Sequence, residues 1–590
     1  MKTVLAALSA QYIHTCLAAR SLCGSARRAG FAVTLCERTV NEPFDDLLAA
    51  LALERPDVIG FPCYLWNIAL VRELCVELRK ILPRVYLCLG GPEVSFCAEK
   101  VLRELPEADF VLSGEGEESF PALLGALAAG RPPGDVPGLW FREAGAVRAA
   151  APAAPVPMAS LPFPYPELLS GDTAPLDGKI LYFETSRGCP FSCTYCLSSR
   201  EGGVRLMPAP LACERLSVFL RARVRQVKFV DRSFNANRAH CDAILAYLLE
   251  HDNGVTNFHF EIEAELLADS TLALIRQARP GLFQFEAGVQ STNRETLRAV
   301  RRSENVMRVL ERCAALRGAG GCHLHMDLIA GLPYEDYASL GRSFDDVFRT
   351  GPHMLQLGFL KLLRGTQLEE DAARFGIVCS TRPPYEVLFT PWISYEELCR
   401  LKKIDSLCGT LYNSGRFSTS LPFLLWAFDS PFAFFETLAS FAEARGAFGR
   451  PWGRYDGHAL LLAFCEARGG EAAHLRWLLR FDALREGRAR GLPDFLTPPQ
   501  PPEAADLLRA AARDEDALLS RFPRLAAVPP RERPAEIRRT FRFAWFPFSP
   551  LTGEAGACIA AIDTAAAVSS ASYAVRPAGE AEAVLPVPGP

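Results

Sequence analysis

The most informative stretch of this 590-residue chain is Thr185-Ser-Arg-Gly-Cys-Pro-Phe-Ser-Cys-Thr-Tyr-Cys196. It places Cys189, Cys193 and Cys196 on one short loop, with three and then two residues between them. Three thiolates can hold a cubane [4Fe-4S] cluster and leave one iron open, since a fourth cysteine would complete its coordination. An open position is what a catalytic metal needs. A structural zinc loop with a distant fourth ligand, or chance clustering in a cysteine-rich chain, is the alternative.

The region around this loop, residues 179–365, alternates strands with helices, which predicts an α/β fold with a parallel sheet. The expected strands are 180–185, 226–231, 257–264, 282–289, 321–329 and 354–361. Six such repeats predict a partial (β/α)6 barrel of the TIM type, with the cysteine loop directly after its first strand.

Three of these strands alternate apolar and polar residues. Because successive side chains in a strand point to opposite faces, each strand has an apolar face for the outer helices and a polar face for the lumen. The apolar set is Phe258, Phe260, Phe283, Phe285, Leu324 and Met326, and the polar set is His259, Glu261, Glu263, Gln284, Glu286, Gln290, His323, His325 and Asp327. A polar lumen suits an enclosed polar cofactor and substrate, and the candidates for substrate contact are Glu261, Glu286, His323, His325 and Asp327. For any one of them, a solvated face or a structural hydrogen bond is the alternative.

A second alternating region, residues 1–148, predicts a doubly wound, Rossmann-like domain. Its expected strands are 3–8, 31–37, 57–63, 85–89 and 109–112. The carboxyl ends of such strands form the ligand crevice, so the loops at 11–15, 64–67, 90–93 and 113–117 should converge on one bound molecule.

The remaining chain carries no motif that translates into chemistry. Residues 149–178 are rich in Pro and Ala and predict a linker or a strap across a surface. Residues 366–568 predict a mainly helical C-terminal domain, and residues 569–590, rich in Ala, Pro and Gly, predict a disordered tail.

Composition narrows the class of protein. Hydrophobic residues make up 49% and charged residues 22%, and 64 Lys and Arg stand against 68 Asp and Glu, for a net charge of −4. We therefore do not expect nucleic acid as a partner, and we interpret the basic runs 221–225 and 298–302 as solvated helix faces. We expect neither a secretion signal nor a membrane span, and 19 cysteines then favour a reducing, cytoplasmic location.

At the cysteine loop, the sequence resembles the radical S-adenosylmethionine (radical SAM) enzymes. The resemblance implies that Cys189, Cys193 and Cys196 hold a [4Fe-4S] cluster and that its open iron binds S-adenosylmethionine. It further implies that Tyr195 packs against the adenine, and that the cofactors carry the radical chemistry while the protein supplies positioning.

The resemblance extends to three further strands. The segments 229–235, 286–291 and 327–333 are similar to the second, fourth and fifth strand motifs of that family. This places Gln290 and Ser291 near the ribose, and with looser motifs it places Glu263 and Gly331 near the cofactor. The Gly-Gly-Glu motif that many members use for the methionine amine is not obvious here.

The N-terminal loops, placed before such a core, resemble the cobalamin-binding domain of the class that fuses the two modules. The residues that this resemblance assigns to cobalamin are Tyr12, His14, Tyr64, Trp66, Asn67, Gly90, Gly91, Glu93, Ser113, Gly114 and Glu115. Cobalamin domains with a histidine lower ligand use Asp-x-His-x-x-Gly, whereas this chain has Tyr12-Ile-His14-Thr-Cys-Leu17, without the Asp and the Gly. Lacking that carboxylate support, His14 is expected to make a loop hydrogen bond rather than to ligate cobalt.

The function implied is that of a cobalamin-dependent radical SAM enzyme, in the first place a methyltransferase. It would methylate an unactivated carbon through a 5'-deoxyadenosyl radical and methylcobalamin, with a small-molecule or peptide substrate. The resemblance also implies an electron donor such as flavodoxin or ferredoxin. Rearrangement, ring contraction or cyclisation without net methylation is one alternative, and a non-turnover cobalamin and cluster sensor or binding protein is another. Modification of RNA, prompted by the basic runs, is a third.

Overall fold

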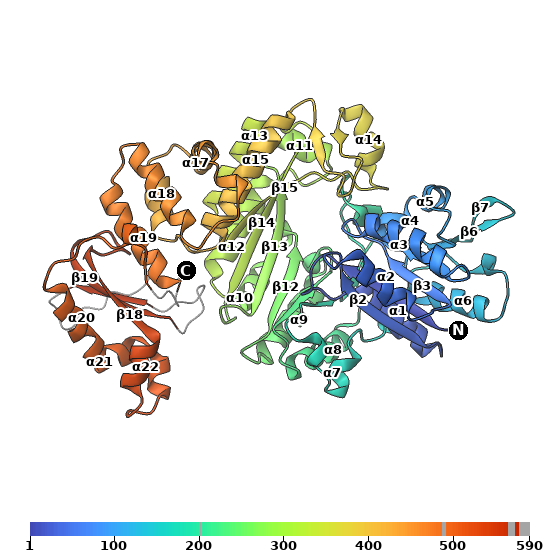
Figure 1. Cartoon of the computed structure of the whole chain (residues 1–590), viewed down its shortest axis with the longest axis horizontal. Coiled ribbons are helices and arrows are strands. Elements are labelled where there is room, and N and C mark those ends of the chain that lie inside the picture. Colours follow the sequence, from blue (N-terminus) through green and yellow to red (C-terminus); the bar gives the residue numbers. More distant parts are fainter. Residues whose placement is uncertain (201, 487–490, 565–572, 578–590) are drawn as a thin grey trace. The chain divides into compact units, whose positions relative to one another are not determined.

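The computed structural model describes residues 1–200, 202–486, 491–564 and 573–577. The chain divides into two compact units. The first comprises Met1–Pro352 and Gly358–Leu398, and the second comprises His353–Leu357 and Cys399–Pro590. Figure 1 traces the elements within each unit. No helix among the described residues is long and apolar enough to cross a membrane.

The first unit begins with a seven-stranded sheet in the order β2-β1-β3-β4-β5-β6-β7. Its strands are β1 (Thr3–Ser9), β2 (Val33–Thr39), β3 (Val58–Pro62), β4 (Tyr86–Gly90), β5 (Phe110–Leu112), β6 (Leu139–Glu143) and β7 (Ala146–Ala149). The first five are parallel, and β6 and β7 add an antiparallel edge. The strand order reverses between β1 and β3, which makes the loops after those two strands the expected ligand crevice.

Helices lie along this sheet, which buries apolar residues on both faces. They are α1 (Leu17–Arg28), α2 (Phe44–Ala52), α3 (Ile68–Ile81), α4 (Pro92–Ser95), α5 (Ala98–Glu104) and α6 (Gly116–Ala128). The predicted doubly wound domain is confirmed. The β6–β7 hairpin was not predicted, because its turn at Ala144-Gly145, with φ of 48° and 81°, lies in a short segment of weak alternation.

The second sheet of six strands has the order β15-β14-β13-β12-β11-β8. Its strands are β8 (Leu181–Phe183), β11 (Gln226–Phe229), β12 (Asn257–Ile262), β13 (Phe283–Gln290), β14 (Cys322–Ala330) and β15 (Met354–Phe359). The accompanying helices are α8 (Ala209–Arg221), α9 (Arg238–Glu250), α10 (Asp269–Ile275), α11 (Arg294–Ala299), α12 (Val306–Ala319) and α13 (Tyr337–Arg349). Strands β8 to β14 pair in parallel, so the predicted partial barrel is confirmed.

Polar side chains set where several of these helices begin. The carboxylate of Asp336 accepts from the Ser339 backbone N–H at the start of α13, and Asn237 does the same for His240 at the start of α9. Each cap satisfies one of the backbone donors that a helix start leaves without a partner.

The segment between the two sheets holds only one short α-helix, α7 (Pro166–Ser170). Tyr165 anchors it, because this side chain is fully buried and its hydroxyl bonds to Thr15 Oγ1 at 3.1 Å and to the Tyr182 backbone N–H at 2.7 Å. The Pro- and Ala-rich segment is therefore held against both sheets of the first unit.

The remaining elements of the first unit are β9 (Ser186–Arg187), β10 (Arg205–Leu206), α14 (Gln367–Phe375), β16 (Val378–Cys379) and β17 (Val387–Phe389). Helix α15 (Tyr395–Cys408) begins in the first unit and ends in the second, which then contains α16 (Ser420–Leu425). The second unit continues with α17 (Pro431–Ala444), α18 (Asp456–Ala467), α19 (Ala472–Arg485), α20 (Ala504–Arg513), α21 (Glu515–Arg521), α22 (Arg533–Thr540), β18 (Phe541–Phe548), β19 (Ala555–Asp563) and β20 (Tyr573–Pro577).

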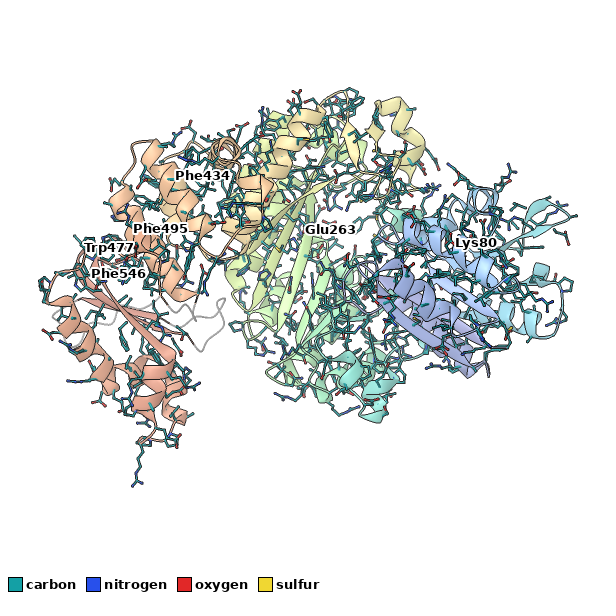
Figure 2. The ribbon with its side chains drawn as sticks, viewed as in Figure 1. Lys80, Glu263, Phe434, Trp477, Phe495 and Phe546 are labelled. Carbon is teal, nitrogen blue, oxygen red and sulfur yellow. The ribbon has the colours of Figure 1, made fainter. Side chains whose placement is uncertain are left out.

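The second unit is mainly helical, as predicted, but it also contains a three-stranded antiparallel sheet. Strand β18 reads FRFAWFPF, and its Phe546 packs against Trp477 of α19 with ring centroids 5.9 Å apart (Figure 2). Strand β20 lies in the segment that was expected to be a disordered tail, and this expectation is wrong for Tyr573–Pro577, because β19 supplies its hydrogen-bonding partner. The rest of 569–590 lies outside the described residues.

Candidate functional site

The cysteine loop leaves the first barrel strand and turns at Gly188. This glycine has φ of +89°, and a Cβ there would lie 2.2 Å from the carbonyl oxygen of Gly203, so no other residue fits without moving the loop. Cys189, Cys193 and Cys196 are free thiols, of which Cys193 is buried and the other two are half-buried. Three unpaired thiols on one loop fit the predicted cluster.

The start of this loop is held by Asp231, which follows β11. Its fully buried carboxylate accepts hydrogen bonds from the Thr185 backbone N–H at 3.0 Å, the Thr185 hydroxyl at 2.7 Å and the Ser186 hydroxyl at 2.6 Å. Burial raises the pKa of Asp231 to about 6, although these donors act in the opposite direction. Asp231 thus fixes the direction in which the chain leaves the barrel toward the cysteines.

The guanidinium of Arg302 lies behind the same loop. It is 3.6 Å from Cys193 Sγ, donates to Glu263 Oε2 at 2.9 Å, and donates to the Gly288 carbonyl at 2.6 Å. Its side chain is 14% exposed. The interpretation of 298–302 as a solvated face is therefore wrong for Arg302, which carries its charge inward to a thiol and a carboxylate. It holds for Arg298, which pairs with Glu304 at the surface.

The five residues expected to bind S-adenosylmethionine have different surroundings. Tyr195 and Gln290 are half-buried, and Glu263 is bound to Arg302. Ser291 has no exposed surface, and its hydroxyl donates to the buried Glu335, so it does not reach the lumen in this conformation. At Gly331, with φ of +90°, a Cβ would lie 2.7 Å from Val387 Cγ1. The space beside this glycine is thus filled by the chain itself.

The lumen of the barrel carries the expected polar side chains. Glu261, Glu286 and His325 are register partners on β12, β13 and β14 and so lie at one level of the sheet. Glu286 Oε2 lies 3.0 Å from His259 Nε2, and His325 Nε2 lies 3.0 Å from Asp327 Oδ1. The apolar set on the opposite face is almost fully buried, as the alternation predicted.

These contacts shift the pKa values of the lumen in opposite directions. Burial would raise the pKa of Glu286, but His259 and Lys228 outweigh it and lower that pKa to about 2. Burial lowers the pKa of His323 to about 4 and raises the pKa of Asp327. Groups whose pKa values diverge in one cavity are typical of sites that bind or transform a ligand.

Ligand atoms of Glu286, His325 and Asp327 lie within 4.8 Å of one another, a spacing that a metal ion could bridge. The Lys228 ammonium, however, is 3.3 Å from Glu286 Oε2. Because the chain itself supplies a positive charge at this point, we interpret the group as a polar lining and not as a second metal centre.

At the carboxyl edge of the N-terminal sheet, two loops expose aromatic rings. Tyr12, after β1, is 67% exposed, and Trp66, after β3, is 51% exposed and stacks on Tyr64 with ring centroids 4.5 Å apart. Exposed aromatic side chains at the point where the strand order reverses fit a large, flat, apolar ligand such as a corrin. Asn67 differs, since it is buried and its amide donates to the carbonyls of Leu8 and Pro62.

His14 points to the barrel. A hydrogen bond of 2.8 Å joins its Nδ1 to the Tyr182 hydroxyl on β8, and His14 and Ile180 form an isolated parallel bridge. Burial and the charge of Lys228 lower the pKa of His14. His14 is thus hydrogen-bonded to a strand of the other sheet of the unit, and its predicted role toward cobalt stays a prediction.

The glycine loops of the edge are packed closely against their neighbours. At Gly91, with φ of +100°, a Cβ would lie 2.7 Å from the Cys63 carbonyl oxygen, and Gly90 precedes it on β4. Glu93 is 6% exposed and accepts a 2.5 Å hydrogen bond from the Tyr385 hydroxyl. Burial raises the pKa of Glu93. The carboxylate expected to contact cobalamin is therefore occupied by Tyr385.

The loop after β5 is built in a similar way. The Ser113 hydroxyl donates to the Ser95 carbonyl at 3.0 Å, and Gly114 has φ of +85°. Glu115 accepts from the Val156 backbone N–H at 2.6 Å and pairs with Arg205. The Glu115 carboxylate, like that of Glu93, is occupied by protein partners.

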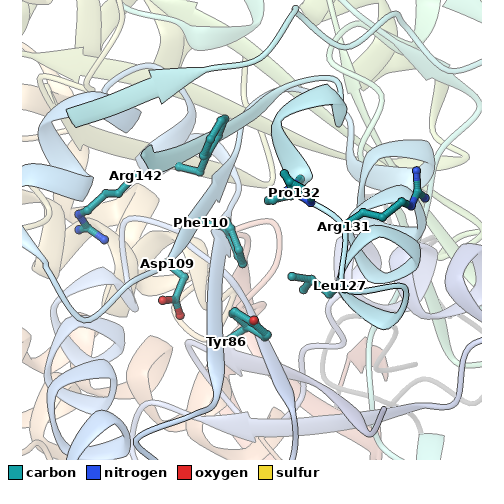
Figure 3. A pocket seen from close by; sticks show the side chains of 10 residues that line it. Tyr86, Asp109, Phe110, Leu127, Arg131, Pro132 and Arg142 are labelled. Atoms are coloured by element: carbon teal, nitrogen blue, oxygen red, sulfur yellow. The ribbon is translucent and has the colours of Figure 1, made fainter. Parts of the chain in front are cut away.

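A hollow of about 540 Å³ lies elsewhere on this domain (Figure 3). Tyr86 and Phe110, which line it, are the first residues of β4 and β5. The hollow is therefore at the opposite end of the strands from the loops described above, and it does not belong to the candidate site.

Five residues that organise the site were missed as site residues: Tyr182, Arg187, Asp231, Arg302 and Tyr385. Asp231 lay inside the segment 229–235 that resembled a family motif, and this was the available signal. Each of the others has at least one partner 70 to 292 residues away, which no local pattern reveals.

Comparison with known proteins agrees with this division of the first unit. The family model described as "B12 binding domain" matches residues 3–124, and the one described as "Radical SAM superfamily" matches residues 183–347. A third, described as "Protein of unknown function (DUF4080)", matches residues 373–550.

Methyltransferase names recur among the curated relatives. The uncharacterized methyltransferase PH0819 of Pyrococcus horikoshii is 31% identical over 200 residues, 33% of this chain and 44% of that protein. The cobalamin-dependent radical SAM methyltransferase TokK of Streptomyces tokunonensis is 25% identical over 327 residues, 52% of this chain and 47% of that protein. The chain thus spans less than half the length of these curated relatives.

A solved structure shows the same fold. The cobalamin-dependent S-adenosylmethionine radical enzyme OxsB, with aqua-cobalamin and S-adenosylmethionine bound, is similar with a TM-score of 0.58 at 15% identity, covering 91% of this chain and 83% of that chain. Both domain types, and the cofactors that such domains take, agree with the expectations from the sequence. The first unit therefore carries a cobalamin-binding domain followed by a radical SAM domain.

Proposed function

We propose that this protein is a cobalamin-dependent radical SAM enzyme that methylates an unactivated carbon of a small-molecule or peptide substrate. The observation that carries the proposal is the direct contact between the two loop systems of the first unit. The hydrogen bond between Tyr182 and His14 and the ion pair between Arg187 and Glu117 join the first barrel strand and the cysteine loop to the carboxyl edge of the N-terminal sheet. Two cofactors can exchange a group through one substrate only if they are held this close.

In this proposal, Cys189, Cys193 and Cys196 hold a [4Fe-4S] cluster, and the rings of Tyr12 and Trp66 lie against cobalamin. When bound, S-adenosylmethionine supplies a radical that removes hydrogen from the substrate, and cobalamin supplies the methyl group. The electron comes from a donor such as flavodoxin or ferredoxin.

The residues of the chain position these groups and keep water away. Asp231 and Gly188 hold the cysteine loop, and Arg302 compensates the negative charge that collects around Cys193 and Glu263. His259, Glu286 and His325 line the lumen with hydrogen-bonding groups that can orient a polar substrate. Preorganised dipoles of this kind need not reorganise during the reaction.

The test measures both products of S-adenosylmethionine at once. Anaerobically reconstituted protein is incubated with a reductant, cobalamin, methyl-labelled S-adenosylmethionine and cell extract, next to a Cys196→Ala control. Methylation predicts 5'-deoxyadenosine and S-adenosylhomocysteine in equal amounts, and a labelled product heavier by one methylene.

Other outcomes decide against the proposal in distinct ways. Deoxyadenosine without S-adenosylhomocysteine, and a product of unchanged composition, would indicate rearrangement, ring contraction or cyclisation. No deoxyadenosine above the Cys196→Ala control would indicate a cobalamin and cluster protein without turnover.

A further inference from the structure

Arg187 lies next to the cysteine loop, since only Gly188, whose conformation is constrained, separates it from Cys189. Its guanidinium donates to Glu117 Oε1 at 2.5 Å and to Glu184 Oε1 at 2.6 Å. A third carboxylate, that of Glu115, lies 3.3 Å away. The Arg187 side chain is 15% exposed and that of Glu117 is 8% exposed, so this is a largely desolvated ion-pair network.

The carboxylates come from two different segments. Glu115 immediately precedes α6 and Glu117 lies in the first turn of α6, at the carboxyl edge of the N-terminal sheet, whereas Glu184 follows β8. Glu117 is fixed further by the Ser21 hydroxyl of α1, which donates to it at 2.9 Å. Burial would raise the pKa of Glu117, but Arg187 outweighs it and lowers that pKa. The Glu117 carboxylate therefore stays charged and bound to Arg187.

The backbone next to Arg187 is packed too closely to move independently of its neighbours. Strand β9, which contains Arg187, pairs with β10 through Arg187 and Arg205, and Arg205 also binds Glu115. At Gly188, a Cβ would collide with Gly203, so the backbone between Arg187 and Cys189 is already in close contact. If Glu115 and Glu117 shifted and displaced Arg187, Cys189 would therefore be displaced as well.

We propose that Arg187 is a positioning residue that couples the two cofactor sites, so that occupancy of one favours occupancy of the other. The inference rests on the proposed function only in that each loop system holds its cofactor. A desolvated guanidinium shared between two segments is satisfied only when both keep the arrangement seen in this structure, because a carboxylate left alone in this environment is costly. Linkage then requires the effect to be equal in both directions.

The experiment measures the affinity for cobalamin in two forms of the full chain, without the cluster and with the reconstituted cluster plus S-adenosylmethionine. Their ratio is the coupling factor. It is determined anaerobically by calorimetry for the natural protein and for the Arg187→Gln, Arg187→Lys and Glu117→Gln variants. Arg200→Gln is the matched control, because Arg200 lies just after the cysteines but pairs with Glu370, outside the N-terminal domain.

We expect the cluster to tighten cobalamin binding at least about fivefold in the natural protein and in Arg200→Gln. Arg187→Gln and Glu117→Gln should bring the factor close to one, and a variant that combines these two substitutions should lose no more than either single variant. Arg187→Lys should keep part of it, since lysine keeps the charge and loses the bidentate geometry. A general loss of stability weakens both affinities and largely cancels in the ratio.

Three results would overturn the inference or its basis. A factor of one in the natural protein, with both cofactors bound, refutes the coupling and leaves the proposed function standing. A factor that persists undiminished in both Glu117→Gln and Arg187→Lys refutes the role of Arg187. These two variants decide the question if Arg187→Gln takes up no cluster. If the natural protein binds neither cofactor, the proposed function itself fails.

Discussion

Replacement of Arg302 by glutamine tests whether the inward-facing guanidinium supports the cysteine loop. The variant removes the charge that lies 2.9 Å from Glu263 Oε2 and 3.6 Å from Cys193 Sγ. Removing one partner of a buried ion pair costs about 3–5 kcal/mol, because the other charge is left without compensation. For a domain of this size, that corresponds to a decrease of roughly 6–20 °C in the Tm of the barrel.

The assay combines scanning calorimetry of the unloaded full chain with iron content after anaerobic reconstitution. We expect Arg302→Gln to lower both the Tm and the bound iron. The matched control is Arg298→Gln, which belongs to the same basic run but pairs with Glu304 at the surface. This control should leave both quantities unchanged, as exposed ion pairs contribute little.

Equal behaviour of the two variants would refute the reasoning. If Arg302→Gln keeps full iron and an unchanged Tm, the charge of Arg302 supports neither Glu263 nor the cysteine loop. If Arg298→Gln loses as much as Arg302→Gln, the whole basic segment acts together and burial is not the cause.

Three further predictions concern the two loop systems. Because burial raises the pKa of Asp231 from 3.8 to about 6, its folded state binds more protons, and the free energy of unfolding should fall by roughly 3 kcal/mol as the pH rises from below 4 to above 6. Asp231→Asn should remove this part of the slope in urea titrations at a series of pH values, and an unchanged slope would contradict the assignment. Gly188→Ala should take up less iron than the natural protein, because its methyl group would meet the Gly203 carbonyl oxygen, and normal iron content would show that the loop can relax. His14→Gln should leave the electron paramagnetic resonance spectrum of the cob(II)alamin-loaded protein unchanged, since the His14 loop lacks the Asp and the Gly of cobalamin domains with a histidine ligand; loss of a nitrogen splitting in the variant would instead identify a cobalt ligand.

Much of the fold could be predicted because its signals are local. Alternation of the type seen at 257–263 reports which face of a strand is buried, and the contact of His259 with Glu286 agrees with the predicted lumen. The five parallel strands of the first sheet and the six of the second were expected close to their observed positions, since each is a short apolar run that ends at a polar loop.

The strand at Tyr573–Pro577 could not be predicted, because its signal is not local. It depends on the free edge of β19, whose Ala-rich sequence at 555–563 has low intrinsic strand preference. Strand β18 carries a stronger signal, because aromatic residues alternate along it. The prediction of a mainly helical domain did not take this alternation into account.

The organisation of the site depended on contacts between distant segments. The resemblance identified the loops at Gly90 and Glu115, but it gave no indication that the glutamates of these loops would be bound by protein side chains. The basic run ending at Arg302 illustrates the same limit, since a run of charges is most often a solvated face and only tertiary structure shows which of its members turns inward.

The most direct test of the account is the metal and cofactor content of the anaerobically reconstituted protein, followed by its reaction with S-adenosylmethionine. The account predicts about four irons and about one cobalamin per chain, and release of 5'-deoxyadenosine on reduction that disappears in the Cys196→Ala variant. Zinc in place of iron, or iron and cobalamin without any deoxyadenosine above that variant, would contradict it.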